Sequence, residues 1–248
     1  MMAPQSILAA LDEPFAPYQR EAVDAAVAQP EAITPFLLER LEAITSDPEG
    51  WLAFEDRGPI LLYSLVLLSH FRETRAHPYV LSLAALPGDV AESLLGDAIS
   101  ELLAMALWRT SGGDPTGIQA VAEDRRAYGY GRWAGMEALT QAALLEELDT
   151  EAIRAILGEW LVDDSFAARG DPAWEALMVN LLALHATEHA HMLRRRVREG
   201  YIAWPVQERE IDDTFNRDRE AALAEAREWA ERRFSDDVHS HLSHWASF

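Results

Sequence analysis

The chain has 248 residues, of which 49% are hydrophobic, and this length and composition exclude general disorder and allow a substantial buried core. Its formal net charge is -21, with 42 acidic against 21 basic side chains, so a nucleic-acid backbone would be repelled and no nucleic-acid partner is expected. A basic protein is the better electrostatic match, although acidity also serves solubility alone. The chain has no cysteine, which excludes disulfides, thiolate zinc sites and cysteine nucleophiles.

The beginning of the chain has no pattern of a secretion signal. Residues 1–8 carry no basic leader, and Asp12 and Glu13 follow before any long apolar run develops. The most apolar stretch, residues 60–68, is far shorter than the ~20 residues needed to cross a bilayer. This stretch therefore predicts a buried core helix. Because neither a secretion signal nor a membrane-spanning segment is recognisable, we expect a cytoplasmic protein with no membrane partner.

Apolar side chains recur at helical spacing almost from end to end of the chain. The clearest stripe places one apolar face on a helix of 3.6 residues per turn, at Trp174, Leu177, Met178, Leu181 and Leu182, and a similar stripe begins at Ile153. Helices are predicted over residues 18–28, 32–46, 57–70, 77–86, 89–108 with an interruption at Gly96, 115–126, 130–146, 150–161, 172–185, 188–199, 206–216 and 219–234. No segment has a convincing strand pattern, so the expected fold is an all-α solenoid of stacked helical hairpins.

The helix pairs predict one repeat domain over residues 1–248. Units begin near residues 57, 95, 130 and 172, and this period of roughly 35–43 residues is close to that of two-helix solenoid repeats. We expect N-terminal capping helices over 1–56, stacked pairs over 57–200, and C-terminal capping helices with a histidine-containing tail over 201–248.

Four aspartates have the sequence context of helix N-caps. Asp114 and Asp171 each precede a proline, Asp89 begins a capping-box spacing, and Asp149 precedes the Ile153 stripe. These positions predict four helix starts.

Several short motifs, in their order along the chain, carry a family resemblance. Residues 127–139, with Arg132 before an Ala- and Gly-rich helix, resemble the second helix of HEAT-type repeats, and their small side chains would let two helices approach closely. Residues 77–79, 95–101, 127–139, 184–185 and 199–202, followed by the acidic run to Phe215, resemble the bacterial family known as domain of unknown function 1186 (DUF1186).

This resemblance covers roughly residues 57–215 and implies an all-α, HEAT-like fold in a bacterial protein. The family brings no established activity or catalytic residues. Some of its relatives carry a cysteine-containing zinc motif at the C-terminus, which this cysteine-free chain lacks.

Three clusters are candidates for metal binding or catalysis. Asp97 and Glu101 share one helix face, where a cation or metal would relieve their repulsion, although Asp97 also suits a helix N-terminus. His185 and His189 have the i, i+4 spacing of a zinc-binding helix, but His185 continues the apolar stripe and Thr187 is a cap candidate that would break the helix. The simpler interpretation of both clusters is structural.

The third cluster lies in the C-terminal tail. Asp237, His241 and His244 would meet one divalent ion if the tail were helical. Alternatively, the tail is polar and docks by its aromatic end. The dense basic run, Arg194–Arg196 with Arg198, has its own counterions at Glu208, Glu210, Asp212 and Asp213, which predicts an internal charge seam.

The sequence favours a non-catalytic binding or scaffold protein that holds a basic protein partner, such as an immunity-type or antitoxin-type inhibitor, and no cofactor is expected. The alternative is a metal-dependent enzyme that uses Asp97, Glu101, His185 or His189. A structural homo-oligomer that pairs through its end helices is also left open.

Overall fold

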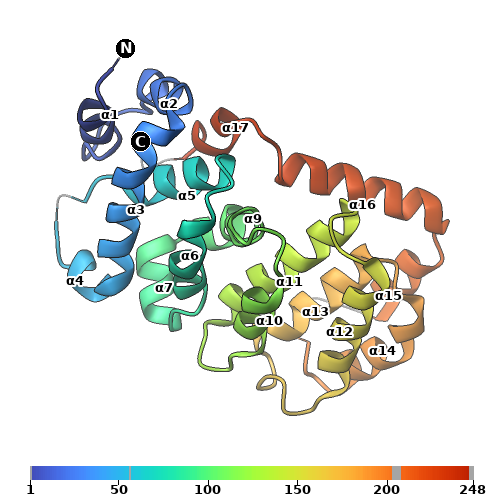
Figure 1. Cartoon of the computed structure of the whole chain (residues 1–248). Coiled ribbons are helices and arrows are strands. Elements are labelled where there is room, and N and C mark those ends of the chain that lie inside the picture. Colours follow the sequence, from blue (N-terminus) through green and yellow to red (C-terminus); the bar gives the residue numbers. More distant parts are fainter. Residues whose placement is uncertain (1, 56, 203–207, 246–248) are drawn as a thin grey trace. The chain divides into compact units, whose positions relative to one another are not determined.

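The computed structural model describes residues 2–55, 57–202 and 208–245 (Figure 1). Helices and the turns between them make up these ranges, and no described residue lies in a strand. This confirms the predicted all-α fold class. The stacking of the helices as regular solenoid hairpins stays a prediction.

The chain divides into two compact units. Unit 1 contains residues 1–114 and 235–248, and unit 2 contains residues 115–234. The C-terminal segment therefore belongs to the same unit as the N-terminal helices. The single repeat domain over residues 1–248, with capping helices at both ends, stays a prediction.

Unit 1 is organised around one helix that is apolar on every side. Its helices are α1 (Pro4–Leu11), α2 (Arg20–Val27), α3 (Pro30–Ser46), α4 (Pro48–Leu52), α5 (Ile60–His70), η1 (Thr74–Ala76), α6 (His77–Ala84), α7 (Gly88–Leu95), α8 (Ala98–Glu101), α9 (Leu103–Thr110) and α17 (Val238–Leu242). Nine of the 11 residues of α5 are buried, and α3, α9 and α17 pack against it (Figure 1). A helix without a polar face must be covered all round, so the prediction of a buried core helix here is confirmed.

Unit 2 has a comparable central helix that is rich in small side chains. Its helices are α10 (Thr116–Glu123), α11 (Gly129–Leu144), α12 (Thr150–Val162), α13 (Pro172–Ala183), η2 (Thr187–His189), α14 (Ala190–Arg198), α15 (Glu208–Phe215) and α16 (Arg219–Arg233). Fourteen of the 16 residues of α11 are buried, and α10, α12, α13 and α16 contact it. A Cβ at Gly135 would lie 3.3 Å from the carbonyl oxygen of Ile118 in α10, so the predicted close approach of two helices is confirmed.

Two of the four predicted aspartate caps are confirmed. The Asp149 carboxylate accepts hydrogen bonds from the first backbone N–H groups of α12, and Asp171 does the same for α13. The other two predictions are wrong. Pro115, not Asp114, occupies the N-cap position of α10, and Asp89 lies inside α7 because that helix already begins at Gly88.

Gly96 interrupts the helical run over 89–108, as predicted. Its φ of +49° is a left-handed conformation that favours glycine, and it ends α7 before α8 begins. The helices that the apolar pattern missed are α1, α4 and α17, which have only five to eight residues each. Such short helices show too few apolar repeats to stand out from a loop.

Arginines close the C-terminal ends of four helices in unit 2. The chain has no lysine, so all 21 of its Lys and Arg positions are arginines. Four of them donate to carbonyl oxygens at or just after helix ends. The pairs are Arg132 with Ala122 of α10 (2.9 Å), Arg227 with Leu144 of α11 (3.0 Å), Arg196 with Leu161 of α12 (2.9 Å) and Arg154 with His185 after α13 (2.5 Å). The last carbonyls of a helix lack partners within it and carry its negative dipole, so a guanidinium there supplies both donors and positive charge.

Candidate functional site

A pocket of about 380 Å³ lies in unit 1. Its walls come from α4, from the loop and first turn of α5, from the end of α7 with the turn that follows, and from the C-terminal segment. The lining residues are Trp51, Arg57, Gly58, Pro59, Leu61, Leu62, Glu92, Ser93, Leu94, Leu95, Gly96, Asp97 and Trp245. Pockets of this size that combine apolar walls with a few polar groups are typical of binding sites.

Two tryptophans give the pocket its aromatic surface. Trp51 lies in α4, where its ring meets the exposed ring of Phe54 edge-on at 6.2 Å between centroids. Trp245 comes from the far end of the chain, and its indole N–H donates to the carbonyl oxygen of His241 at 2.7 Å. Both indoles are half-buried, so part of each remains open to a ligand.

Two carboxylates and one guanidinium set the charge of the pocket lining. Asp97 occupies the N-cap position of α8, where its side chain makes no capping hydrogen bond, and Glu92 lies one turn earlier on α7. Both are exposed. The Arg57 guanidinium donates to the carbonyl oxygens of Leu52 and Phe54 at the end of α4. The lining therefore has a net charge of -1, and its arginine is already engaged by backbone carbonyls.

The predicted pair of Asp97 and Glu101 lies on one helical turn. The Glu101 backbone N–H donates to the Asp97 carbonyl oxygen at 3.0 Å, which places both residues on the same side of α8. Asp97 lines the pocket, whereas Glu101 is exposed outside it. Asp97 also lies at a helix N-terminus, as the structural interpretation of this pair expected.

His185 and His189 do not share a continuous helix. The helix α13 ends at Ala183, His185 has a φ of +51°, and His189 ends η2. His185 is buried against Phe215, with 5.7 Å between ring centroids, and neither of its ring nitrogens has a hydrogen-bond partner within the described ranges. A Cβ at Gly158 would lie 2.2 Å from the His189 ring, so that ring packs on the glycine of α12.

Asp237, His241 and His244 are each occupied by nearby backbone groups. The Asp237 carboxylate caps α17, the His241 Nε2 lies 2.9 Å from the Ser235 carbonyl oxygen, and the His244 Nδ1 lies 3.1 Å from the Ser240 carbonyl oxygen. Over the part of the chain that the structure describes, no group of three histidine or acidic residues is arranged to hold a metal ion. The metal-dependent enzyme thus gains no support from a ligand cluster.

The charge seam predicted for the arginine run is present in unit 2. Arg194 pairs with Asp212 at 2.5 Å, and Arg198 lies 3.8 Å from Glu208. Arg196 instead is buried and pairs with Asp164 at 2.6 Å. These contacts use the run internally, as expected.

A hydrogen-bonded chain of three side chains in unit 1 was not predicted. The Tyr18 hydroxyl lies 2.5 Å from His239 Nδ1, and His239 Nε2 lies 3.0 Å from the Asp24 carboxylate. Burial raises the pKa of Tyr18 to about 12, so the phenol keeps its proton and donates to Nδ1, which leaves Nε2–H to donate to Asp24. Tyr18 and His239 are separated by 221 positions in the sequence, so no local sequence pattern predicts their contact.

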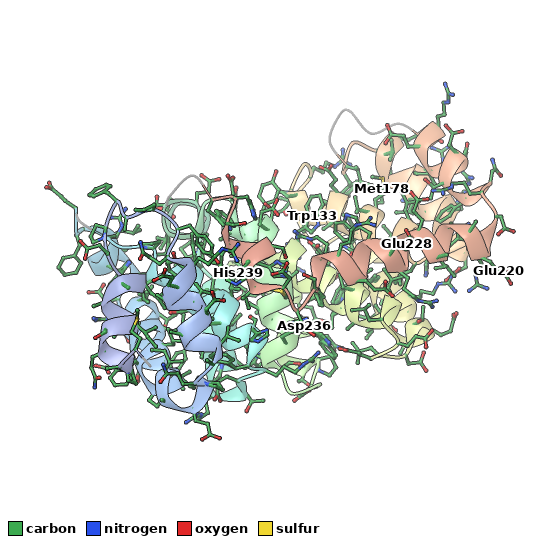
Figure 2. The ribbon with its side chains drawn as sticks, turned by 90° about the horizontal axis from the view of Figure 1, so that it is seen from above. Trp133, Met178, Glu220, Glu228, Asp236 and His239 are labelled. Atoms are coloured by element: carbon green, nitrogen blue, oxygen red, sulfur yellow. The ribbon has the colours of Figure 1, made fainter. Side chains whose placement is uncertain are left out.

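The same segment supplies a partner to a buried arginine. Asp236 lies 2.8 Å from Arg109, whose side chain is only 5% exposed. Asp236 and His239 are both labelled in Figure 2, on either side of the start of α17. Unit 1 thus holds its C-terminal segment through polar contacts at two places.

No helix among the described residues is long and apolar enough to cross a membrane.

No solved structure matches the chain significantly. An uncharacterized protein of Chlamydia muridarum (strain MoPn / Nigg) is 30% identical over 183 residues, which cover 74% of this chain and 72% of that protein. An uncharacterized protein of Chlamydia trachomatis serovar D (strain ATCC VR-885 / DSM 19411 / UW-3/Cx) is 28% identical over the same shares. The model of a protein family of unknown function, DUF1186, matches residues 2–248, a longer range than the motifs covered, and the chain therefore belongs to the DUF1186 family, as predicted.

Proposed function

We propose that the protein is a non-catalytic binding module of the cytoplasm, and that the pocket of unit 1 receives a lysine or arginine side chain from a basic segment of a protein partner. The observation that carries this proposal is the composition of the pocket, in which Trp51 and Trp245 are combined with the carboxylates of Glu92 and Asp97. Aromatic faces attract cations through their quadrupole, by about 0.5–2 kcal/mol each, and carboxylates attract them through charge.

The apolar part of the lining suits the same ligand. Leu61, Leu62 and Leu94 provide surface for the methylene stem of a long basic side chain, whose charged head then meets the carboxylates. A purely apolar ligand would gain nothing from the two carboxylates, and an anion would be repelled by them.

The charge of the whole unit favours the same class of partner. Unit 1 has 19 acidic residues and 6 arginines, a formal charge of -13, whereas unit 2 has 23 acidic residues and 15 arginines, a formal charge of -8. The unit that contains the pocket is thus the more negative of the two. Its field would accelerate the approach of a basic segment and make the association sensitive to salt.

Fluorescence anisotropy with a short poly-arginine peptide tests this proposal directly. A poly-lysine peptide provides the second cationic probe, and a poly-citrulline peptide, which keeps the shape of arginine without its charge, is the ligand control. Binding of both cationic peptides and not of citrulline is expected at low salt. The affinity should fall at ~1 M salt, where the screening length is about 3 Å.

A pair of matched variants separates the pocket from diffuse attraction. Glu92→Gln with Asp97→Asn removes two charges from the pocket, and Glu39→Gln with Glu42→Gln removes two from the exposed side of α3. We expect the pocket variant to bind about three- to tenfold more weakly and the α3 variant to change less than twofold. Equal losses in the two variants would show that the peptide follows only the net charge, and the pocket would then not be the site.

A further inference from the structure

We infer that the C-terminal segment, residues 235–245, is an adjustable wall of this pocket, and that His239 is the positioning residue that keeps this wall docked on unit 1. The inference rests on the proposed function, because it concerns how the same pocket is made available to its ligand. Trp245 is the member of the segment that lines the pocket.

The position of Trp245 depends on α17. Its indole N–H bonds to the carbonyl oxygen of His241, which lies within that helix, and its backbone N–H bonds to Leu242. Any displacement of α17 on unit 1 therefore moves the indole with it.

The helix α17 cannot hold its own place. It has five residues, and isolated helices shorter than ~12 residues are marginal in water. Its attachment to unit 1 includes the packing of α17 on α5, with Val238 and Leu242 buried, and two polar anchors. A short terminal segment that depends on tertiary contacts in this way is of the kind that opens locally.

The first polar anchor is the pair of Asp236 with buried Arg109, and the second is His239 between Tyr18 and Asp24. His239 is the anchor inside α17 itself. With one ring nitrogen accepting from the phenol and the other donating to the carboxylate, the imidazole satisfies both neighbours at once. Other charged groups near this ring are Arg20, which lies over the Tyr18 ring, and Asp237 at the start of the helix.

Binding and docking must then be linked. If the complete pocket exists only when the wall is docked, the apparent dissociation constant is the intrinsic one divided by the docked fraction. A ligand that contacts Trp245 in turn raises that fraction by the same coupling free energy. Loss of His239 should weaken binding, and the ligand should restrain the segment.

The absence of cysteine allows a clean measurement of both effects. A nitroxide on Ser243→Cys, at an exposed position directly after α17, reports the mobility of the wall by electron paramagnetic resonance. A nitroxide on Ser82→Cys, exposed on α6 and outside the pocket lining, is the control label. The poly-arginine peptide should reduce the mobile fraction at residue 243 and leave residue 82 unchanged.

Two substitutions at His239 distinguish positioning from general damage. His239→Ala should enlarge the mobile fraction at residue 243 and weaken peptide binding by about fivefold, which corresponds to a docked fraction of about one fifth. His239→Gln keeps one acceptor and one donor on the side chain and should restore much of both values. Rescue by glutamine would not be expected if alanine merely disturbed the fold.

The outcomes separate this inference from the proposed function. If the peptide binds through Glu92 and Asp97 but the label at residue 243 responds neither to peptide nor to His239→Ala, the wall is fixed and the inference fails alone. If the peptide does not bind the wild-type protein, both proposals fail.

Discussion

The two units hold their short helices together with different polar interactions. Unit 2 places arginines on the carbonyl ends of four helices, and two of these guanidinium groups also lie over aromatic rings. Unit 1 fastens its C-terminal helix with an aspartate on Arg109 and with a histidine between Tyr18 and Asp24. Three of these four arginines, Arg132, Arg154 and Arg196, are buried inside unit 2, whereas the anchors of unit 1 are open to solvent on one side.

This difference separates a fixed scaffold from an adjustable one. A guanidinium that satisfies a buried carbonyl cannot leave without exposing that carbonyl to an apolar interior. An exposed carboxylate or a half-buried imidazole can exchange its partner for water at little cost. We therefore expect unit 2 to tolerate substitution of its arginines poorly and unit 1 to respond gradually to changes in its anchors.

The largest effect is expected at Arg196 in unit 2. Its side chain is 1% exposed, donates to the Leu161 carbonyl, pairs with Asp164 and lies 4.6 Å from the ring of Trp174. Arg196→Ala removes all of these contacts and leaves a cavity, so the free energy of unfolding should fall by about 3 kcal/mol. Urea denaturation followed by circular dichroism measures the change, and hydrogen exchange should show it in residues 160–201.

The neighbouring arginine is the matched control. Arg195 is 49% exposed and pairs with Glu199 at 2.7 Å on the same helix. Arg195→Ala should change the free energy of unfolding by no more than about 0.5 kcal/mol. Equal losses for Arg195 and Arg196 would remove the distinction between capping and surface arginines on which the comparison of the units depends.

The sequence predicts most helices of both units and the charge seam of unit 2, but neither the arginines at the helix ends of unit 2 nor the polar anchors of α17 in unit 1. The apolar pattern predicts α5 and α11 because the side chains that each helix buries lie close together in the sequence. The seam of Arg194 with Asp212 is also predictable, since both partners belong to dense charged runs close together in the chain. The bond of Arg132 to the Phe166 carbonyl spans 34 positions and ends on a backbone atom, which no side-chain pattern marks.

The candidate site was predictable only in fragments. Asp97 stood out through its spacing to Glu101, and Gly96 through its place in a helical run, and both line the pocket. The aromatic walls are not recognisable as a pair in the sequence, because Trp51 and Trp245 lie far apart along the chain and come to the same pocket only through folding. The helix that positions Trp245 is itself too short to be found by periodicity.

A smaller effect is expected at Asp236 in unit 1. Asp236→Asn keeps the shape of the side chain but removes the charge opposite Arg109. Because Asp236 is 75% exposed, water replaces part of the lost interaction, and we expect a loss of about 1–2 kcal/mol, with faster hydrogen exchange over 235–245. Asp89→Asn, at an exposed position in the first turn of α7, is the control and should cost no more than about 0.5 kcal/mol. If the two variants were equally stable, Asp236 would not be an anchor.

The smallest effect is expected from His77 and depends on pH. His77 lies at the start of α6 with Nδ1 3.1 Å from the Thr110 hydroxyl, and burial lowers the pKa of His77, against a smaller opposing effect of Asp114. As the pH falls below the ordinary histidine value of about 6.5, the unfolded chain takes up a proton that the folded chain resists, so the folded state loses stability.

His77→Gln keeps a hydrogen-bonding side chain without this titration. Between pH 7 and about 5.5 the wild-type protein should therefore lose stability relative to His77→Gln by less than about 1 kcal/mol. Thermal unfolding of both proteins across this range measures the difference, and titration of the other acidic and histidine side chains cancels in it. Hydrogen exchange should place the difference in unit 1, because His77 and Thr110 both belong to it. Parallel pH profiles of the two proteins would show that the imidazole titrates alike in the folded and unfolded chain, and the graded response of unit 1 would then rest on the anchors of α17 alone.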